Sequence, residues 1–110
     1  MPSEHPKEEP GMLERDLVRR IRTYLCSLEG CFSWKEHGGM YGTAGIPDII
    51  CCYRGRFVAF EVKVPGNPPT PLQKSTLEKI RRAGGTAEVV QSLDEVKATL
   101  EKTEVCHGEN

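Results

Sequence analysis

The first segment with a clear pattern of apolar and polar positions has the spacing of an amphipathic helix. From Met12 onward the apolar residues recur every three or four positions, while arginines occupy another face. Gly30 is expected to end this helix, because glycine commonly follows the last turn. The apolar positions are Leu13, Leu17, Val18, Ile21, Tyr24, Leu25 and Leu28, and the arginines are Arg15, Arg19 and Arg22.

The middle of the chain has the pattern of strands. Residues 31–37 ("CFSWKEH") favour a strand, and the four glycines in 38–45 ("GGMYGTAG") predict an irregular loop. Residues 46–53 ("IPDIICCY") predict a buried strand, 54–55 ("RG") a tight turn, and 56–64 ("RFVAFEVKV") the returning strand of a hairpin. In this last strand one face is wholly apolar, whereas the other ends in charged residues.

The remaining third predicts a helix, a strand and a helix. Thr70 as N-cap, Pro71 at the first helical position and Gln73 as partner of a capping box predict a helix that runs to Ala83. "TAEVV" then favours a strand, and "SLDE" repeats the capping-box pattern before a last helix. The inward positions of this last helix are Leu93, Val96 and Leu100. The predicted order is α-β-β-β-α-β-α, an α/β fold.

Length and composition limit the chain to one ordinary domain. Its 110 residues allow one modest core, which we place at 11–103, with a disordered lead-in at 1–10 and a flexible tail at 104–110. No apolar run approaches the roughly 20 residues of a membrane span. The acidic, proline-containing start does not resemble a secretory signal. We therefore expect a cytoplasmic protein that does not enter a membrane.

The charge is unevenly distributed along the chain. The net charge is −1, but residues 11–100 hold 13 Lys and Arg against 10 Asp and Glu, a balance of +3. The acids gather at the two ends. The body is therefore mildly basic, which permits phosphate binding without requiring it.

The five cysteines and the glycine-rich loop do not indicate further chemistry. The cysteines are odd in number, and neither they nor the three histidines show zinc-ligand spacing, so we expect reduced and mostly buried thiols. Cys51 and Cys52 should point to opposite faces of a strand. The loop at 38–45 lacks the GK[ST] ending of a phosphate-binding loop and leads into a strand, so no nucleotide cofactor is expected.

The hairpin carries the charges that most need an explanation. Its short turn brings Asp48, at the start of one strand, beside Glu61 and Lys63, at the end of the other. Val62 offers a backbone carbonyl at the same level. Two carboxylates with a carbonyl form a hard-oxygen site suited to Mg²⁺ or Mn²⁺. A divalent cation beside an ammonium group is a combination that can catalyse phosphodiester hydrolysis.

Glu14 adds a third acid, because it precedes Val18 and Ile21 by four and seven residues and therefore lies on the inward face of the first helix. If that helix packs on the charged face of the hairpin, Glu14 can reach the same cation directly or through a water. The simpler interpretation is a structural salt bridge from Lys63 to Glu61 and Asp48. One lysine, however, cannot neutralise two or three buried acids, and an unpaired buried charge costs several kcal/mol.

These residues resemble a known nuclease family. The arrangement "GIPD … EVK … Q", with a helical Glu upstream, is similar to the VRR-Nuc branch of the PD-(D/E)XK superfamily, over residues 12 to about 97. The resemblance implies the restriction-endonuclease-like fold, a mixed central sheet flanked by helices. It also implies that Asp48, Glu61 and the Val62 carbonyl hold the metal, that Glu14 completes the site, and that Lys63 is the catalytic lysine.

The resemblance implies a supporting role for Gln73 as well, although its capping role explains this residue equally well. Lys35, Tyr41, Arg15 and Arg19 are candidate DNA contacts, and each can equally be an ordinary surface residue. Small members of the family resemble phage-type and bacterial nucleases that act as homodimers on branched DNA such as four-way (Holliday) junctions. We therefore expect a Mg²⁺- or Mn²⁺-dependent DNA endonuclease. The alternatives are a non-catalytic nucleic-acid-binding module and an adaptor that binds no nucleic acid.

Overall fold

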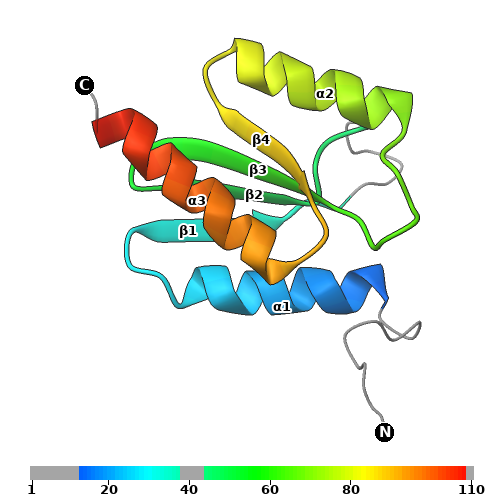
Figure 1. Cartoon of the computed structure of the whole chain (residues 1–110), viewed down its shortest axis with the longest axis horizontal. Coiled ribbons are helices and arrows are strands. Elements are labelled where there is room, and N and C mark those ends of the chain that lie inside the picture. Colours follow the sequence, from blue (N-terminus) through cyan, green and yellow to red (C-terminus); the bar gives the residue numbers. More distant parts are fainter. Residues whose placement is uncertain (1–12, 38–43, 109–110) are drawn as a thin grey trace, which may run out of the picture.

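The chain folds into one four-stranded sheet with helices on both faces (Figure 1). The computed structural model describes residues 13–37 and 44–108, and the side chains of 105–108 are left out of the description. In the described ranges the order is α-β-β-β-α-β-α, as the sequence predicted. The elements are α1 (Glu14–Cys26), β1 (Cys31–Lys35), β2 (Ile49–Tyr53), β3 (Arg56–Val62), α2 (Pro71–Arg82), β4 (Thr86–Val90) and α3 (Leu93–Gly108).

The sheet is mixed. Its strand order is β1-β2-β3-β4, in which the first three strands are antiparallel neighbours and β4 runs parallel to β3. The parallel pair needs a crossover, which α2 supplies. The predicted "RG" turn joins β2 and β3, and both Arg54 and Gly55 have positive φ, 52° and 85°, as a type I′ hairpin turn requires.

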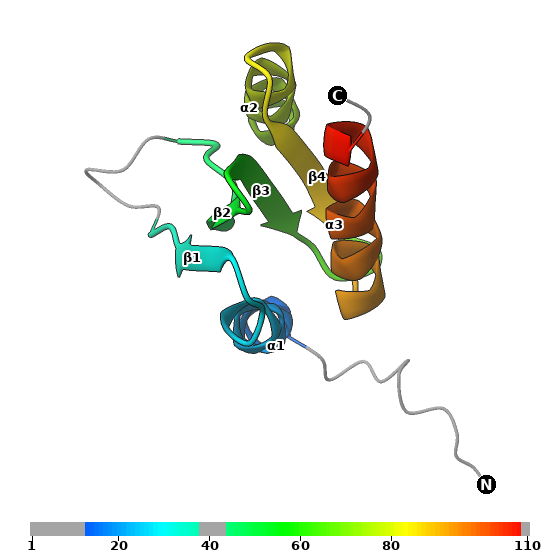
Figure 2. The same ribbon diagram turned by 90° about the vertical axis from the view of Figure 1, so that its left-hand side faces the viewer.

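The helices divide the core into two layers. Viewed from the side, α1 and α3 cover one face of the sheet and α2 covers the other (Figure 2). Phe60 of β3 and Ile49 of β2 pack with Leu17 and Ile21 of α1 in the larger layer. The smaller layer, under α2, is built around Leu77, with Ile50, Ala59 and Ala87 from the sheet.

The two predicted helix starts differ in detail. At α2 the full capping box is present: Gln73 N donates to Thr70 Oγ1 (3.1 Å) and Thr70 N donates to Gln73 Oε1 (2.9 Å). At α3, Glu95 N donates to Ser92 Oγ (3.2 Å), but the Glu95 carboxylate accepts from Gln91 N (2.7 Å). This second box therefore reaches one residue further back than the pattern predicts.

Several element bounds differ from the predicted ones. Helix α1 ends at Cys26, and a turn then leads to Gly30, whose φ of 77° lies in the left-handed region. β2 begins only after Pro47, which has no amide hydrogen for the ladder. Helix α3 continues to Gly108, across the residues predicted as a flexible tail. The residues predicted as the lead-in, 1–10, lie outside the described residues.

The thiols are less buried than expected. Cys51 is buried and Cys52, on the opposite face of β2, is exposed, in keeping with strand alternation. Cys26 is exposed as well, and the described cysteines form no disulfide. None of the helices within residues 13–37 and 44–108 is both long and apolar enough to cross a membrane.

Candidate active site

The hairpin brings together the acidic residues that the sequence singled out. Ile49 pairs with Phe60, so Asp48 immediately before β2 stands opposite Glu61 in β3. The Asp48 carboxylate accepts a hydrogen bond from Val62 N, at 2.8 Å from Oδ2. Lys63 follows β3 directly and its amide donates to the Val90 carbonyl at 3.0 Å, which fixes the backbone at this end of the strand.

Glu61 lies in an environment that disfavours its charged form. The residue is only 2% exposed, and its Oε1 has no hydrogen-bond partner among the described residues. Burial raises the pKa of Glu61 to about 8, and the neighbouring Asp48 carboxylate adds to this rise. Lys63 lowers the pKa of Glu61, but not enough to restore an ordinary value.

The salt bridge that the simpler interpretation requires is present, at 3.8 Å between Lys63 Nζ and Glu61 Oε2. Lys63 is itself 8% exposed. Because the pKa of Glu61 stays well above its usual range, this ammonium does not offset the combined effect of burial and the second carboxylate. A salt bridge therefore exists, but it does not balance the site.

Glu14 approaches the site from the other layer. Helix α1 packs through Leu17, Val18 and Ile21 on the apolar face of the sheet, not on the charged face. Glu14 is the first residue of α1, at the edge of the sheet, and its charge still raises the pKa of Glu61. Among the described residues no three His, Cys, Asp or Glu side chains gather closely enough to hold a metal ion. The role of Glu14 as a third metal ligand therefore stays a prediction.

The other predicted residues occupy varied positions. Gln73 uses its side-chain oxygen in the cap of α2. Lys35, at the end of β1, pairs with Ile49 and its ammonium donates to the Glu36 carbonyl at 3.4 Å. Arg15 and Arg19 are exposed on α1, and Tyr41 lies outside the described residues.

Glu36 is a further acid beside the site that the sequence interpretation missed. Its amide donates to the Asp48 carbonyl (2.8 Å), and its carboxylate accepts from Trp34 Nε1 (2.8 Å). Extending the strand at 31–37 antiparallel to the hairpin would have placed Glu36 opposite Asp48, so the signal was present in the segment "WKEH".

Gly45, in the "GIPD" segment, lets the loop before Asp48 approach α2. Its φ is +83°, and a Cβ atom there would lie 2.8 Å from Leu72 Cγ and 2.9 Å from Thr76 Oγ1. Only glycine fits this position without movement of the neighbours. The loop that leads into Asp48 is therefore packed directly on the first turns of α2.

The donor set fits a hard divalent cation. Carboxylate oxygens are ligands that Mg²⁺ and Mn²⁺ prefer. The buried Glu61 Oε1 has an unused lone pair, and a bound cation would stabilise the charged form that burial now disfavours. The residues present therefore suit the cofactor that the family resemblance implies.

The sequence matches no known family profile and no curated protein. Two solved structures are similar to the chain. One, described as "VRR_NUC domain", is 27% identical with a TM-score of 0.67, over 80% of this chain and 94% of that chain. The other, described as "VRR_NUC domain protein", has a TM-score of 0.66 at 21% identity, over 83% of this chain and 87% of that chain, and shows the fold alone.

The first of these similarities covers 80% of this chain, and the mixed sheet with its helix order is the restriction-endonuclease-like one. The chain therefore resembles a solved VRR_NUC domain in both sequence and fold, which supports a nuclease-type domain.

Proposed function

We propose that the protein is a metal-dependent DNA endonuclease that hydrolyses phosphodiester bonds. The observation that carries this proposal is the buried Glu61 carboxylate, which has an oxygen without a hydrogen-bond partner among the described residues and faces Asp48 and Lys63. A structural ion pair is not expected to leave a carboxylate in this state. In a nuclease-type domain, a carboxylate of this kind can serve as a ligand for the catalytic metal.

The proposed roles are those that the family resemblance implies, and the positions of Asp48, Glu61 and Lys63 support them. Asp48, Glu61 and the Val62 carbonyl would hold Mg²⁺ or Mn²⁺, and Glu14 would contribute directly or through a water. The cation, when bound, polarises a phosphoryl oxygen and lowers the pKa of a water. Lys63 directs its ammonium into the same space as Glu61, where it orients the attacking water or offsets the charge that develops on the phosphate.

We further propose that the substrate is branched DNA, such as a four-way junction, and that two copies act together. The described residues of each chain form one such site, and a two-fold dimer would present two sites to a two-fold junction. The edge strand β1 supports self-association, because Phe32 is 70% and Trp34 39% exposed and their ring centroids lie 5.7 Å apart. Exposed apolar residues on an edge strand are a typical interaction surface.

The competing function is a non-catalytic nucleic-acid-binding module with the same fold. In that case the charges would form only a salt-bridge cluster. Calorimetry with Mn²⁺ separates the two functions: the nuclease binds Mn²⁺ and loses that binding in Asp48→Asn, whereas the binding module shows no heat that depends on Asp48.

The decisive experiment is cleavage of a DNA panel. Purified protein is incubated with linear, flapped, nicked and four-way DNA and with supercoiled plasmid, in Mg²⁺, Mn²⁺ or EDTA, and its mass in solution is measured alongside. We expect cutting with either metal, and loss of cutting in Asp48→Asn, Glu61→Gln and Lys63→Ala. The exposed Glu101→Gln on α3 serves as the control. If the three site variants cut as well as the wild type, the site is misassigned.

A further inference from the structure

A pocket of about 500 Å³ lies between α1 and β1, separate from the acidic site. Its arginines recur at intervals of four and three residues, so they form a stripe along one side of α1. Lys35 faces this stripe from β1. The lining residues used here, which define the basic pocket, are Arg15, Arg19, Arg22, Thr23, Cys26 and Lys35.

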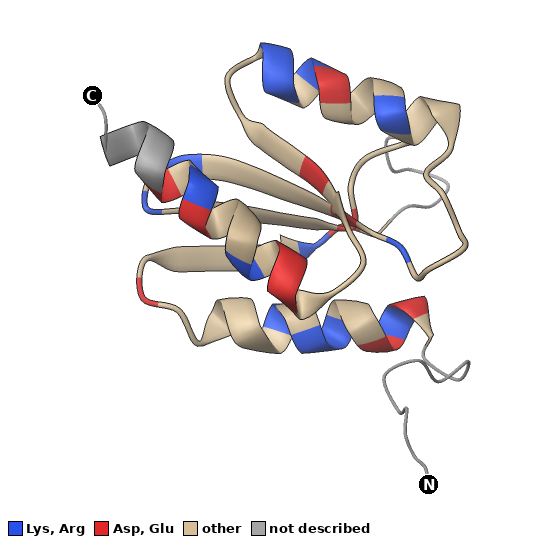
Figure 3. Cartoon of the chain, in the orientation of Figure 1, with Lys and Arg blue, Asp and Glu red and all other residues tan. Residues whose placement is uncertain are grey.

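The basic pocket has a surplus of positive charge. Four cationic side chains line it and no acidic side chain does. The only ion pair that the described residues offer to this set joins Arg19 to Asp16 at 3.6 Å, and both side chains are solvent-exposed. Exposed pairs of this kind contribute little, so Arg19 remains available to another anion. Basic residues follow α1 along most of its length (Figure 3).

Arg22 gives the strongest indication of a missing ligand. Its Nε is shielded from solvent and has no hydrogen-bond partner among the described residues. A buried donor without an acceptor costs free energy. The neighbouring cations also repel the Arg22 guanidinium. An anion in the basic pocket would supply the acceptor and offset the charge.

The remaining lining identifies the chemistry of that anion. No aromatic, Asn or Gln side chain of the described residues lines the basic pocket, so its lining offers mainly positive charge for phosphates and no ring on which a base could stack. Arg15 and Arg22 are seven residues apart, a span of about 10 Å along a helix, which is about three base-pair steps of duplex DNA. A row of phosphates matches this spacing better than one small anion does.

Two residues of the basic pocket are neighbours in the fold of residues in the acidic site, although the pocket lies on the α1 face of the sheet and the acidic site on the other face. Arg15 follows Glu14 in α1, and Lys35 pairs with Ile49, the residue after Asp48. A DNA backbone lying in the basic pocket would therefore continue past the end of the sheet where Asp48 and Glu61 face each other.

We infer that the basic pocket holds the phosphate backbone of DNA on one side of the cleavage point, independently of base sequence. This inference rests on the proposed nuclease function. It assigns Arg22 as a DNA contact together with Arg15, Arg19 and Lys35, and it makes α1 the element that positions DNA relative to the site.

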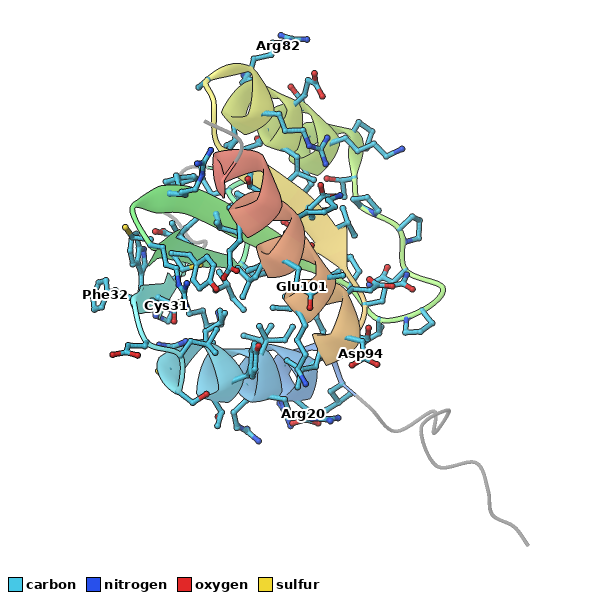
Figure 4. The ribbon with its side chains drawn as sticks, turned by 60° about the vertical axis from the view of Figure 1, so that its left-hand side comes forward. Arg20, Cys31, Phe32, Arg82, Asp94 and Glu101 are labelled. Carbon is cyan, nitrogen blue, oxygen red and sulfur yellow. The ribbon has the colours of Figure 1, made fainter. Side chains whose placement is uncertain are left out.

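The salt dependence of DNA binding tests the assignment directly. Affinity for two short duplexes of unrelated sequence is measured in EDTA over a range of KCl concentrations. The variant Arg15→Gln/Arg22→Gln should bind more weakly and lower the salt slope by about 2, since each phosphate contact contributes about 0.9. Arg20→Gln is the matched control, because Arg20 is an exposed arginine of the same helix that points away from the sheet (Figure 4).

A thiol footprint provides a second measurement without mutation. Cys26 lines the basic pocket, whereas Cys52 is exposed on the opposite face of the sheet. Saturating duplex should slow the alkylation of Cys26 by N-ethylmaleimide several-fold, as followed by peptide mass spectrometry, and leave the rate at Cys52 unchanged. Equal protection of both thiols, or of neither, would overturn the inference.

The outcomes separate this inference from the proposed function. One outcome is that the wild type cuts DNA with Mg²⁺ while the double variant keeps the wild-type salt slope of DNA binding or has the same DNA affinity as Arg20→Gln. In that case only the basic pocket is misassigned. A clear preference for one duplex sequence would contradict backbone-only contact. If the wild type neither binds nor cuts any DNA, the proposed function fails first. Thermal melts verify folding, and Arg15→Gln alone, at an exposed position, keeps the test valid if Arg22→Gln unfolds the chain.

Discussion

Replacing Glu61 with glutamine should make the metal-free protein more stable above neutral pH. Burial and the Asp48 charge raise the pKa of Glu61 from 4.5 to about 8. The folded state therefore binds the Glu61 proton more tightly than the unfolded state does. The resulting contribution to stability is fully present below the unfolded pKa and is lost as the pH rises through the folded one. The glutamine side chain of the variant would carry no charge to bury at any of these pH values.

The size of the effect follows from the shift. At 1.36 kcal/mol per pKa unit, the stability that Glu61 contributes should fall by about 3 kcal/mol between about pH 5 and about pH 8. This is a large share of the roughly 5 to 15 kcal/mol that stabilises a typical domain. In a domain of this size it corresponds to a change in Tm of roughly 10 °C or more.

Urea unfolding in EDTA, followed by far-UV circular dichroism over this pH range, measures the difference between Glu61→Gln and the wild type. The difference should be small near pH 5 and should grow to about 3 kcal/mol in favour of the variant near pH 8. Glu101→Gln, which makes the same chemical change at an exposed position of α3, should show no such trend. A variant that is less stable than the wild type near pH 8, or a difference that does not change with pH, would refute the assigned burial of the Glu61 charge.

The same contacts lead to three further predictions. Mn²⁺ at a hundred times its Kd should stabilise the wild type by about 3 kcal/mol. At one fixed Mn²⁺ concentration the stabilisation should be larger at pH 8 than at pH 6, because protons compete for the carboxylates, and thermal melts of Glu61→Gln should show no shift with Mn²⁺. Gly45→Ala should unfold at a lower urea concentration and cut DNA more slowly than Gly66→Ala. Both glycines have positive φ, which costs a residue with a side chain about 1 to 2 kcal/mol. Of the two, only Gly45 has neighbouring atoms that an added Cβ would contact. Thr70→Ala should lose about 1 kcal/mol with the loss of its cap and keep its cleavage rate; Gln73→Ala should match it in both measurements if Gln73 only caps, and a further loss of cleavage would assign it the supporting role.

Local sequence signals predicted the parts of the fold that depend on neighbouring residues. The start of α2 is specified within four residues, from Thr70 to Gln73, and the structure confirms both capping hydrogen bonds. The hairpin turn is specified by Arg54 and Gly55, and its register places Asp48 opposite Glu61 as expected. Hydrogen bonds between residues close in sequence need no knowledge of the rest of the fold.

Packing between distant elements was not predictable in the same way. The amphipathic pattern of α1 shows which side is buried but not which face of the sheet receives it, and so the approach of Glu14 differed from the expected one. Helix α3 continues past residue 103, where the sequence placed the end of the domain, and residues at this point have partners elsewhere: Tyr53 donates to Glu104, and Thr103 is buried and contacts Thr86. Neither partner is visible in the local sequence of α3.

The turn at Arg54 and Gly55 also determines the register that brings Asp48 and Glu61 together, although this turn lies at the other end of β2 and β3. Side chains alternate along a strand, so a slip of one residue would move Glu61 to the apolar face and Val62 to the charged one. The type I′ geometry, with positive φ at both turn residues, fixes the two-residue loop and therefore the register. Asp48 and Glu61 meet because of this turn and despite their mutual repulsion. Above about pH 8, where Glu61 carries its charge, the free energy that holds the two carboxylates together in the metal-free protein therefore comes from the hairpin and its core, and the site itself contributes a cost that a bound cation would relieve.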